Sequence, residues 1–123
     1  MTRTNKKVRY RPKSRAYRGP SAAADAARDT EQALRMLEGR WKLVIIFHLF
    51  VKPVLRFSEL ERAIPAASQK MLIQQLRGLE RDGIVRRTVY PQVPPKVEYA
   101  LTKFGQALCP ALDVLLKWAA LRA

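Results

Sequence analysis

The segment from Ser68 to Arg81 has two distinct faces when it is wound as a helix, and this limits the possible folds. At about 100° per residue, one narrow arc holds only leucines: Leu72, Leu76 and Leu79. The opposite arc holds basic and amide side chains: Lys70, Gln74, Arg77 and Arg81. Ser68 can cap the start of the helix, and Gly83 is placed to end it. The pattern predicts a helix that buries its leucines and presents a basic face.

The spacing of apolar residues changes from helical to alternating directly after this helix. Residues 84–90 are rich in β-branched and aromatic side chains, and Val97, Tyr99 and Leu101 alternate along the chain. Both patterns are typical of β-strands. The proline-rich stretch 91–96 lies between them as a stiff turn. The chain therefore predicts a β-hairpin after the helix.

Two helices are expected in the first half of the chain. The first begins near Ser21 and stops at Gly39, a residue type that commonly ends helices. The second covers Trp41 to Val51 and is apolar on all sides, so we expect it to be buried, with Trp41 and Phe47 in the core. His48 on this helix is expected to be a hydrogen-bonded structural histidine.

A short third helix and a long last helix complete the expected elements. Ser58 is expected to cap the short helix, with Glu61 as its capping-box partner. The preceding Arg56-Phe57 is expected to be a short extended connector at most, and Phe57 is expected in the core. The last helix is expected to start at the cap Thr102 and to run to about residue 121, with a kink at Pro110.

Three helices followed by a hairpin define the winged helix-turn-helix plan, so the predicted fold is mainly α with a small β-hairpin. One domain of this kind would span residues 21–123. The first and last helices carry more apolar surface than a lone domain of this size needs. We therefore expect these two terminal helices to build a two-fold homodimer.

The charge of the chain points to a polyanionic partner. The 123 residues include 24 Lys and Arg against 10 Asp and Glu, a formal charge of +14. Residues 1–20 hold eight of the basic residues and no acid, and we expect them to be a disordered basic tail. The remaining body is still basic. A surplus of one sign on this scale favours nucleic acid over an anionic membrane surface.

Several function classes are excluded by the sequence. One cysteine and one histidine supply neither an internal disulfide nor a four-ligand zinc site, so no metal and no cofactor are expected. Cys109 is expected to be buried and inert, and His48 is not placed to serve a catalytic serine, so no enzyme is expected. The longest apolar run has nine residues, which is too short to span a membrane. No secretory signal is expected, and a cytoplasmic, nucleoid-associated protein is expected.

The motifs resemble those of the HxlR-type regulators, relatives of the MarR winged-helix proteins, over about residues 33–118. The segments that carry the resemblance, in family order and spacing, are residues 33–41 (ALRMLEGRW), 56–60 (RFSEL), 68–72 (SQKML), 76–83 (LRGLERDG) and 89–99 (VYPQVPPKVEY). Many members of the family carry a cysteine just before the first helix, whereas residues 21–32 have none here. The resemblance therefore implies a DNA-binding transcriptional regulator. The absence of a cysteine before the first helix argues against thiol sensing through a residue at that position. It does not cover the basic tail.

In this fold the helix from Ser68 to Arg81 would enter the major groove of double-stranded DNA. Arg77 could bond bidentately to guanine, and Gln69 or Gln74 to adenine. Ser68 and the helix N-terminus suit a phosphate, and Lys70 could reach phosphate or guanine. The expected contacts from the hairpin to the DNA backbone or minor groove are Arg86, Arg87 and Lys96.

The leading hypothesis is a sequence-specific regulator that binds an inverted-repeat operator as a homodimer. Its two recognition helices would lie about 34–36 Å apart, one turn of DNA. One alternative is a nonspecific architectural nucleic-acid binder driven by the basic tail. Another is an interaction module whose winged helix binds protein. A small-molecule effector could bind near the dimer interface, although the sequence reveals no polar pocket for it.

Overall fold

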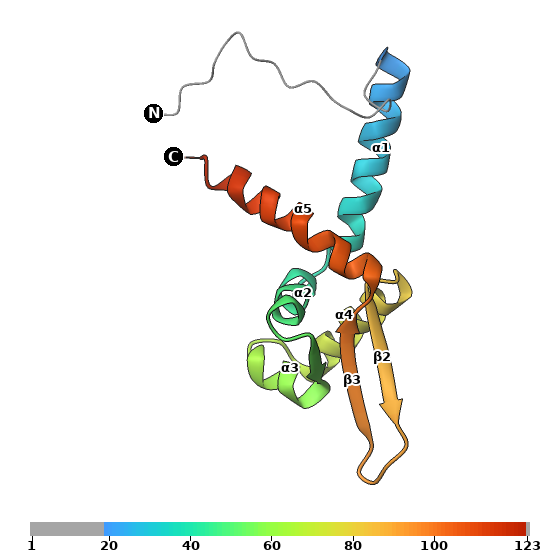
Figure 1. The fold of residues 1–123 in the computed structure, drawn as a ribbon, viewed down its shortest axis with the longest axis vertical. Helices are drawn as coiled ribbons and strands as arrows, with labels where there is room; N and C mark the ends of the chain where they lie inside the picture. The colour runs from blue at the N-terminus through green and yellow to red at the C-terminus, as the bar shows by residue number, and fades with distance from the viewer. Residues whose placement is uncertain (1–18, 123) are drawn as a thin grey trace.

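The computed structural model describes residues 19–122. It contains five helices and three strands in the order α1 (Gly19–Leu37), α2 (Lys42–Val51), β1 (Val54–Arg56), α3 (Phe57–Ala63), α4 (Gln69–Arg81), β2 (Val85–Tyr90), β3 (Lys96–Leu101) and α5 (Lys103–Ala119) (Figure 1). The expected tail of residues 1–20 lies outside the described residues, apart from Gly19 and Pro20, which open α1. The predicted order of helices and hairpin is confirmed.

The sheet has three antiparallel strands in the order β1-β3-β2. β2 and β3 form the predicted hairpin, in which Arg87 pairs with Tyr99 and Tyr90 pairs with Lys96. β1 is a third strand that the sequence did not predict, because a three-residue segment has too little pattern of its own. Its pairing with β3, with Leu55 opposite Tyr99, makes it a strand. The expected connector at Arg56-Phe57 is therefore wrong, since Arg56 ends β1 and Phe57 begins α3.

The core lies between α2, α3, α4 and the inner face of the sheet. The three leucines of α4 are at most 1% exposed, as predicted, and they pack with residues such as Ile45, Ile46 and Leu60. Burial of each such side chain contributes about 1.5–3 kcal/mol. These contacts fix the orientation of α4, and its opposite face is left in solvent.

Both ends of α4 are defined by local hydrogen bonds. At the start, the Ser68 side chain accepts a hydrogen bond from the Met71 backbone N–H at 3.1 Å. At the end, Gly83 has φ +76°, Ile84 N–H donates to Leu79 C=O at 2.9 Å, and Gly83 N–H donates to Glu80 C=O at 3.0 Å. This is a Schellman arrangement, in which the left-handed residue reverses the chain. It confirms both predicted ends and leads the chain directly into β2.

The terminal helices cover little of the core. α1 extends away from the body in Figure 1, and only its last residues, Met36 and Leu37, pack against the core. α2 is not buried on all sides as expected, because no element among residues 19–122 covers its outer face. Leu43, Val44 and Phe47 are 36–40% exposed, so placing Phe47 in the core was wrong. Trp41 and Phe57 are partly buried against the core.

The start of α5 is joined closely to the start of β2. Thr102 caps the helix as predicted, since its Oγ1 accepts a hydrogen bond from Gly105 N–H at 3.1 Å. Thr102 N–H also donates to Ile84 C=O at 3.0 Å. Gly105 is essential to this contact, because a Cβ there would collide with the Ile84 carbonyl oxygen. Pro110 lies inside α5, and the kink expected there stays a prediction.

Gly105→Ala is expected to destabilise the fold by about 2–3 kcal/mol, because its methyl group meets a backbone atom that cannot move without shifting β2. Gly83→Ala is the matched control. It meets no atom within 4 Å and adds only the strain of a left-handed residue, about 1 kcal/mol. Urea unfolding of both variants measures the difference. Equal losses would show that α5 does not depend on this close contact.

Candidate nucleic-acid interface

α4 presents a continuous polar face to solvent. All five predicted site residues on this helix and its N-cap are exposed: Ser68, Gln69, Lys70, Gln74 and Arg77. Arg81, at the far end, is exposed and lies 3.8 Å from the Asp82 carboxylate through its Nε. The predicted basic face of the helix is therefore present. Its position is set by the buried leucines on the opposite side.

The alternation of β2 separates two arginines that are adjacent in sequence. Arg87 pairs with Tyr99, which is buried, so Arg87 lies on the face of the hairpin that looks toward α4. Arg86 pairs with Ala100 and lies on the opposite face. Side chains on a strand point to alternate sides with a period of two. Only one of the two arginines can therefore act together with α4.

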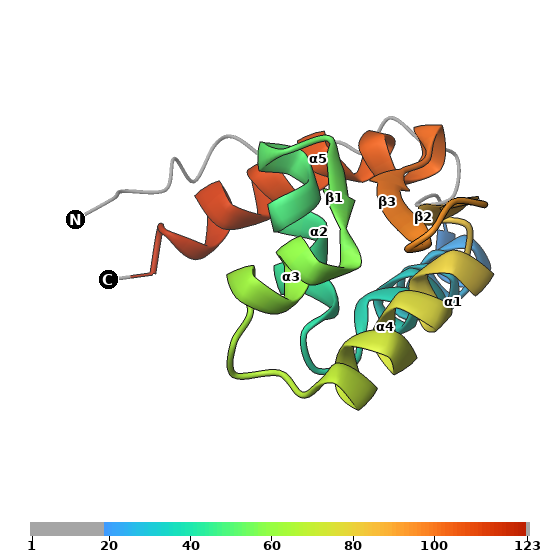
Figure 2. The ribbon, with the colours of Figure 1, turned by 90° about the horizontal axis from the view of Figure 1, so that it is seen from below.

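A groove of about 420 Å³ lies between α4 and the hairpin. α4 contacts β2 directly and lies beside it in Figure 2. The residues that line the groove are Phe57, Gln69, Ile73, Arg77, Glu80, Arg87, Val97 and Tyr99. It brings together three of the predicted residues, Gln69, Arg77 and Arg87. Lys70 and Gln74 are not among its lining residues and lie further round the exposed face of α4.

Sequence reasoning did not identify the remaining residues of this groove. Ile73 lies one turn before Arg77, and Val97 and Tyr99 are two apart on β3, so helical and strand spacing could have placed each on its own element. Only the packing of the hairpin against α4 brings the two sets together. Glu80 adds a carboxylate to a surface that the sequence described as basic.

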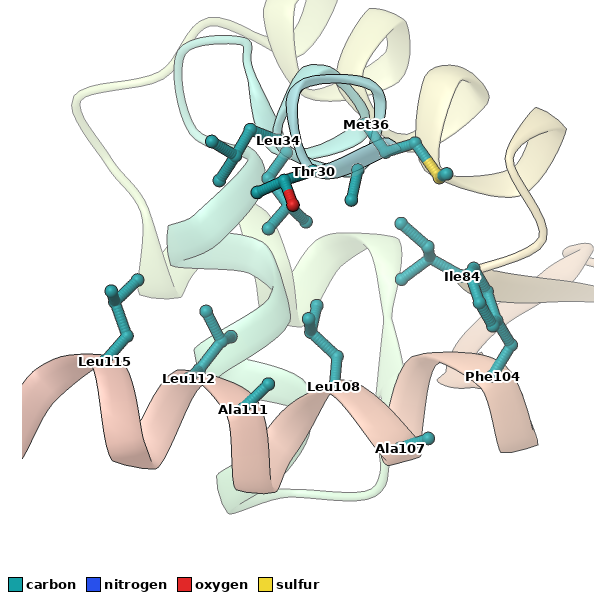
Figure 3. A pocket seen from close by; sticks show the side chains of 12 residues that line it. Thr30, Leu34, Met36, Ile84, Phe104, Ala107, Leu108, Ala111, Leu112 and Leu115 are labelled. Carbon is teal, nitrogen blue, oxygen red and sulfur yellow. The ribbon is translucent and has the colours of Figure 1, made fainter. Parts of the chain in front are cut away.

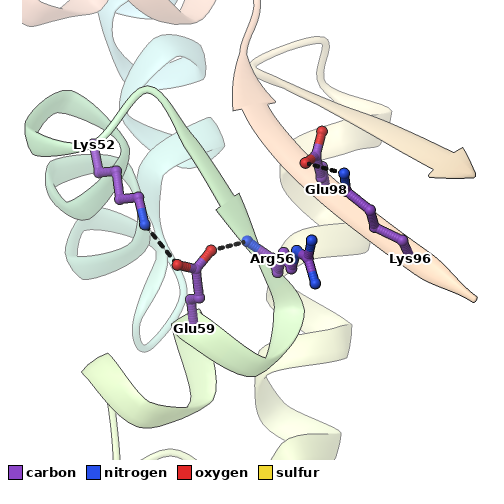
Figure 4. A network of polar contacts seen from close by, with 5 residues as sticks. All are labelled: Lys52, Arg56, Glu59, Lys96 and Glu98. Atoms are coloured by element: carbon purple, nitrogen blue, oxygen red, sulfur yellow. Dashed lines mark hydrogen bonds and ion pairs between the residues drawn. The ribbon is translucent and has the colours of Figure 1, made fainter. Parts of the chain in front are cut away.

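Lys96 is held within the hairpin. Its Nζ lies 3.3 Å from the Glu98 carboxylate (Figure 4) and 4.7 Å from the centre of the Tyr90 ring. The hydrogen bond to Glu98 and the charge of that carboxylate raise the pKa of the Tyr90 hydroxyl, whereas the Arg86 charge acts in the opposite direction. Lys96 is 25% exposed and would have to leave these partners to reach a DNA phosphate.

The start of α3 is organised by Glu59 and not by the predicted pair. Glu59 accepts hydrogen bonds from the Arg56 backbone N–H at 2.8 Å and from Lys52 Nζ at 2.6 Å (Figure 4). The prediction of Ser58 and Glu61 as cap and partner is wrong, because the helix begins one residue before Ser58. The Arg56 N–H and the Lys52 ammonium lower the pKa of the Glu59 carboxyl.

The residues considered for other chemistry do not form a second site. Cys109 is exposed on α5 and not buried as predicted, because it lies at an open pocket that it shares with Leu49 and Phe50 of α2 and does not pack into the core. His48 is half-buried on α2. Within residues 19–122, no group of three or more histidine, cysteine or acidic side chains could hold a metal ion. Over the same residues, no helix is long and apolar enough to cross a membrane.

The three-helix unit, the hairpin behind it and the exposed basic face of α4 define a winged helix-turn-helix protein. The HxlR-like helix-turn-helix family matches residues 36–122, and the chain belongs to this family. It is thus a DNA-binding transcriptional regulator of the MarR-like winged-helix group.

Individual relatives show the same family and fold. The uncharacterized HTH-type transcriptional regulator YtcD of Bacillus subtilis is 51% identical over 90 residues, covering 73% of this chain and 71% of YtcD. A crystal structure of a ytcD regulator superposes with a TM-score of 0.69 at 50% identity, covering 74% of this chain and 92% of that one. The structure of the redox regulator HypR in its reduced form superposes with a TM-score of 0.69 at 44% identity, covering 75% of this chain and 90% of the HypR chain.

Glu59→Gln is expected to lower stability at neutral pH and to flatten its fall in acid. A carboxylate with a lowered folded-state pKa contributes stability above its unfolded pKa, about 4.3, and loses it as the pH falls through the folded value. Thermal unfolding of both proteins from pH 7 to pH 3 measures the effect. Glu61→Gln, the same change at a position that cannot reach the Arg56 N–H, is the control. A Glu59→Gln curve parallel to the wild-type curve would contradict this role.

Proposed function

We propose that this regulator binds a specific, inverted-repeat DNA site as a homodimer, with α4 in the major groove and the β2–β3 hairpin as its wing. The observation that carries the proposal is the placement of the polar face of α4 beside the inward face of the hairpin, with the leucine face buried. A helix docked in this way can reach base edges while the wing contacts the adjacent backbone.

Lys70 and Gln74 are the proposed base-reading residues, because they lie outside the groove on the most outward part of α4. Gln74 suits adenine and Lys70 suits guanine or a phosphate. The N–H groups at the start of α4, next to Ser68, suit a phosphate through the helix dipole. Gln69 stays a candidate for adenine, and Arg86 and Lys96 stay candidates for backbone contacts from the wing.

The dimer is proposed to form through α1 and α5. These helices enclose an apolar groove of about 400 Å³ in which Leu34 and Met36 face Leu108, Leu112 and Leu115 (Figure 3). Leu34, Leu115 and Trp118 are 48–67% exposed in a single chain. A second copy would cover this surface and place two α4 helices about 34–36 Å apart. A small-molecule effector at this interface stays a sequence-based hypothesis.

Selection from randomised duplexes is expected to yield a two-fold symmetric site whose binding survives an excess of random DNA. Gln74→Ala should lower affinity for that site by about 5- to 150-fold, because a bidentate base contact contributes about 1–3 kcal/mol. Its affinity for random DNA should stay close to the wild-type value. Gln106→Ala removes the same amide from α5 and serves as the control. Wild-type binding that random DNA abolishes would favour the architectural alternative instead.

Light scattering after size exclusion is expected to give twice the 14.1 kDa chain mass at micromolar concentration. Leu115→Glu places a charge on the proposed interface and should shift the protein to the monomer. Val93→Glu, at a side chain that is 99% exposed on the hairpin turn, is the control and should stay dimeric. A wild-type mass of 14.1 kDa under these conditions would rule out the proposed dimer.

A further inference from the structure

The groove between α4 and the hairpin carries an inference that rests on the proposed DNA binding. We infer that it holds one segment of the DNA sugar–phosphate backbone, and that Arg77 and Arg87 together bind a single phosphate in it. Arg77 is then a phosphate-binding residue that sets the register of α4 on the duplex, and it is not the guanine reader that the sequence suggested.

The first support is that two arginines from different elements line the same groove. Arg77 comes from α4 and Arg87 from β2, and both line the same groove. Neither forms an ion pair with a carboxylate of residues 19–122. Two like charges facing a shared space repel each other, and an anion between them removes this cost. A phosphate accepts hydrogen bonds from two guanidinium groups at once.

The second support is the direction in which Arg77 faces. Arg77 lines the groove together with Ile73 and Gln69, on the side of α4 that faces the hairpin. Lys70 and Gln74 do not line the groove, and they lie on the part of α4 that would face the major groove. If α4 lies in the major groove and the wing contacts the adjacent backbone, as proposed above, the DNA strand between these two contacts passes over this groove. Arg77 is placed to meet that strand.

The third support is the lining of the groove. Ile73 and Val97 are half-buried and give it an apolar floor that matches the carbon face of a deoxyribose. Glu80 also lines the groove, one turn beyond Arg77 toward the C-terminal end of α4. Its negative charge disfavours an anion at that end, so the phosphate lies on the side of Gln69. The mixture of two cations, one acid and an apolar floor fits a sugar–phosphate unit better than a base edge.

The test uses the duplex that the full-length wild-type protein selects. Each phosphate in turn is replaced by an uncharged methylphosphonate, and binding is measured for the wild type, Arg77→Ala and Arg87→Ala. We expect one position per half-site where the replacement weakens wild-type binding about tenfold, as expected for a charge-assisted hydrogen bond. At that same position both variants should lose only about threefold, since each keeps one of the two arginines and with it about half of the binding free energy of the site.

Lys70→Ala is the matched control, because it removes one cation from the same helix outside the groove. It should retain the full methylphosphonate effect at that position. Circular dichroism of each variant confirms that the exposed substitutions leave the fold intact. Arg77→Ala should also weaken selected and random duplexes by a similar factor, because phosphate contacts carry no sequence information.

Two results would overturn the inference. One is a methylphosphonate effect that is the same in the wild type and both arginine variants at every position. The other is a loss of wild-type DNA affinity when a guanine is replaced by 7-deazaguanine, if the Arg77→Ala variant does not show the same loss. That result would make Arg77 a guanine reader. Failure of the wild type to select any sequence would instead count against the proposed function, since no fixed register would then exist to test.

Discussion

Burial of the leucine face of α4 is the interaction on which the rest of the structure depends. Leu72, Leu76 and Leu79 are almost completely removed from water against α2, α3 and the sheet. A helix held along one face in this way can rotate little about its axis, so its opposite face has a defined direction. The polar residues of α4 are therefore presented to a partner in a fixed arrangement before any partner binds. That preorganisation reduces the entropy lost on docking.

The hairpin obtains its position from the same helix. The Schellman turn at Gly83 connects the last turn of α4 to β2 with no intervening loop. The period of two along β2 then places Arg87 toward α4 and Arg86 away from it. At the other end of β3, α5 is held to the start of β2 through Thr102 and Gly105. The groove with its two arginines is thus a consequence of one buried helix, one tight turn and strand alternation.

The exposed surface of α1, α2 and α5 has a different physical character. α1 and the second half of α5 expose leucines and a tryptophan that no other part of residues 19–122 covers, and α2 adds an exposed apolar face of its own. Apolar surface of this extent commonly marks a protein–protein interface. The molecule therefore separates an apolar face suited to self-association from a polar, basic face suited to DNA. The core between them joins the two surfaces rigidly.

The sequence by itself determined the order of the elements, the buried leucines, both ends of α4 and the basic residues on its exposed face, because these follow from periodicity and local capping. It could not determine β1, the Glu59 cap or the exposed side of α2, which depend on what each segment packs against. The roles of Arg86 and Arg87 were also indistinguishable in sequence, since both are adjacent basic residues of the wing, and Arg77 was assigned to guanine from its helix face alone. Only the tertiary structure brings Arg77 and Arg87 to one groove and turns Arg86 away, because a helix face and a strand face must pack together to create that space.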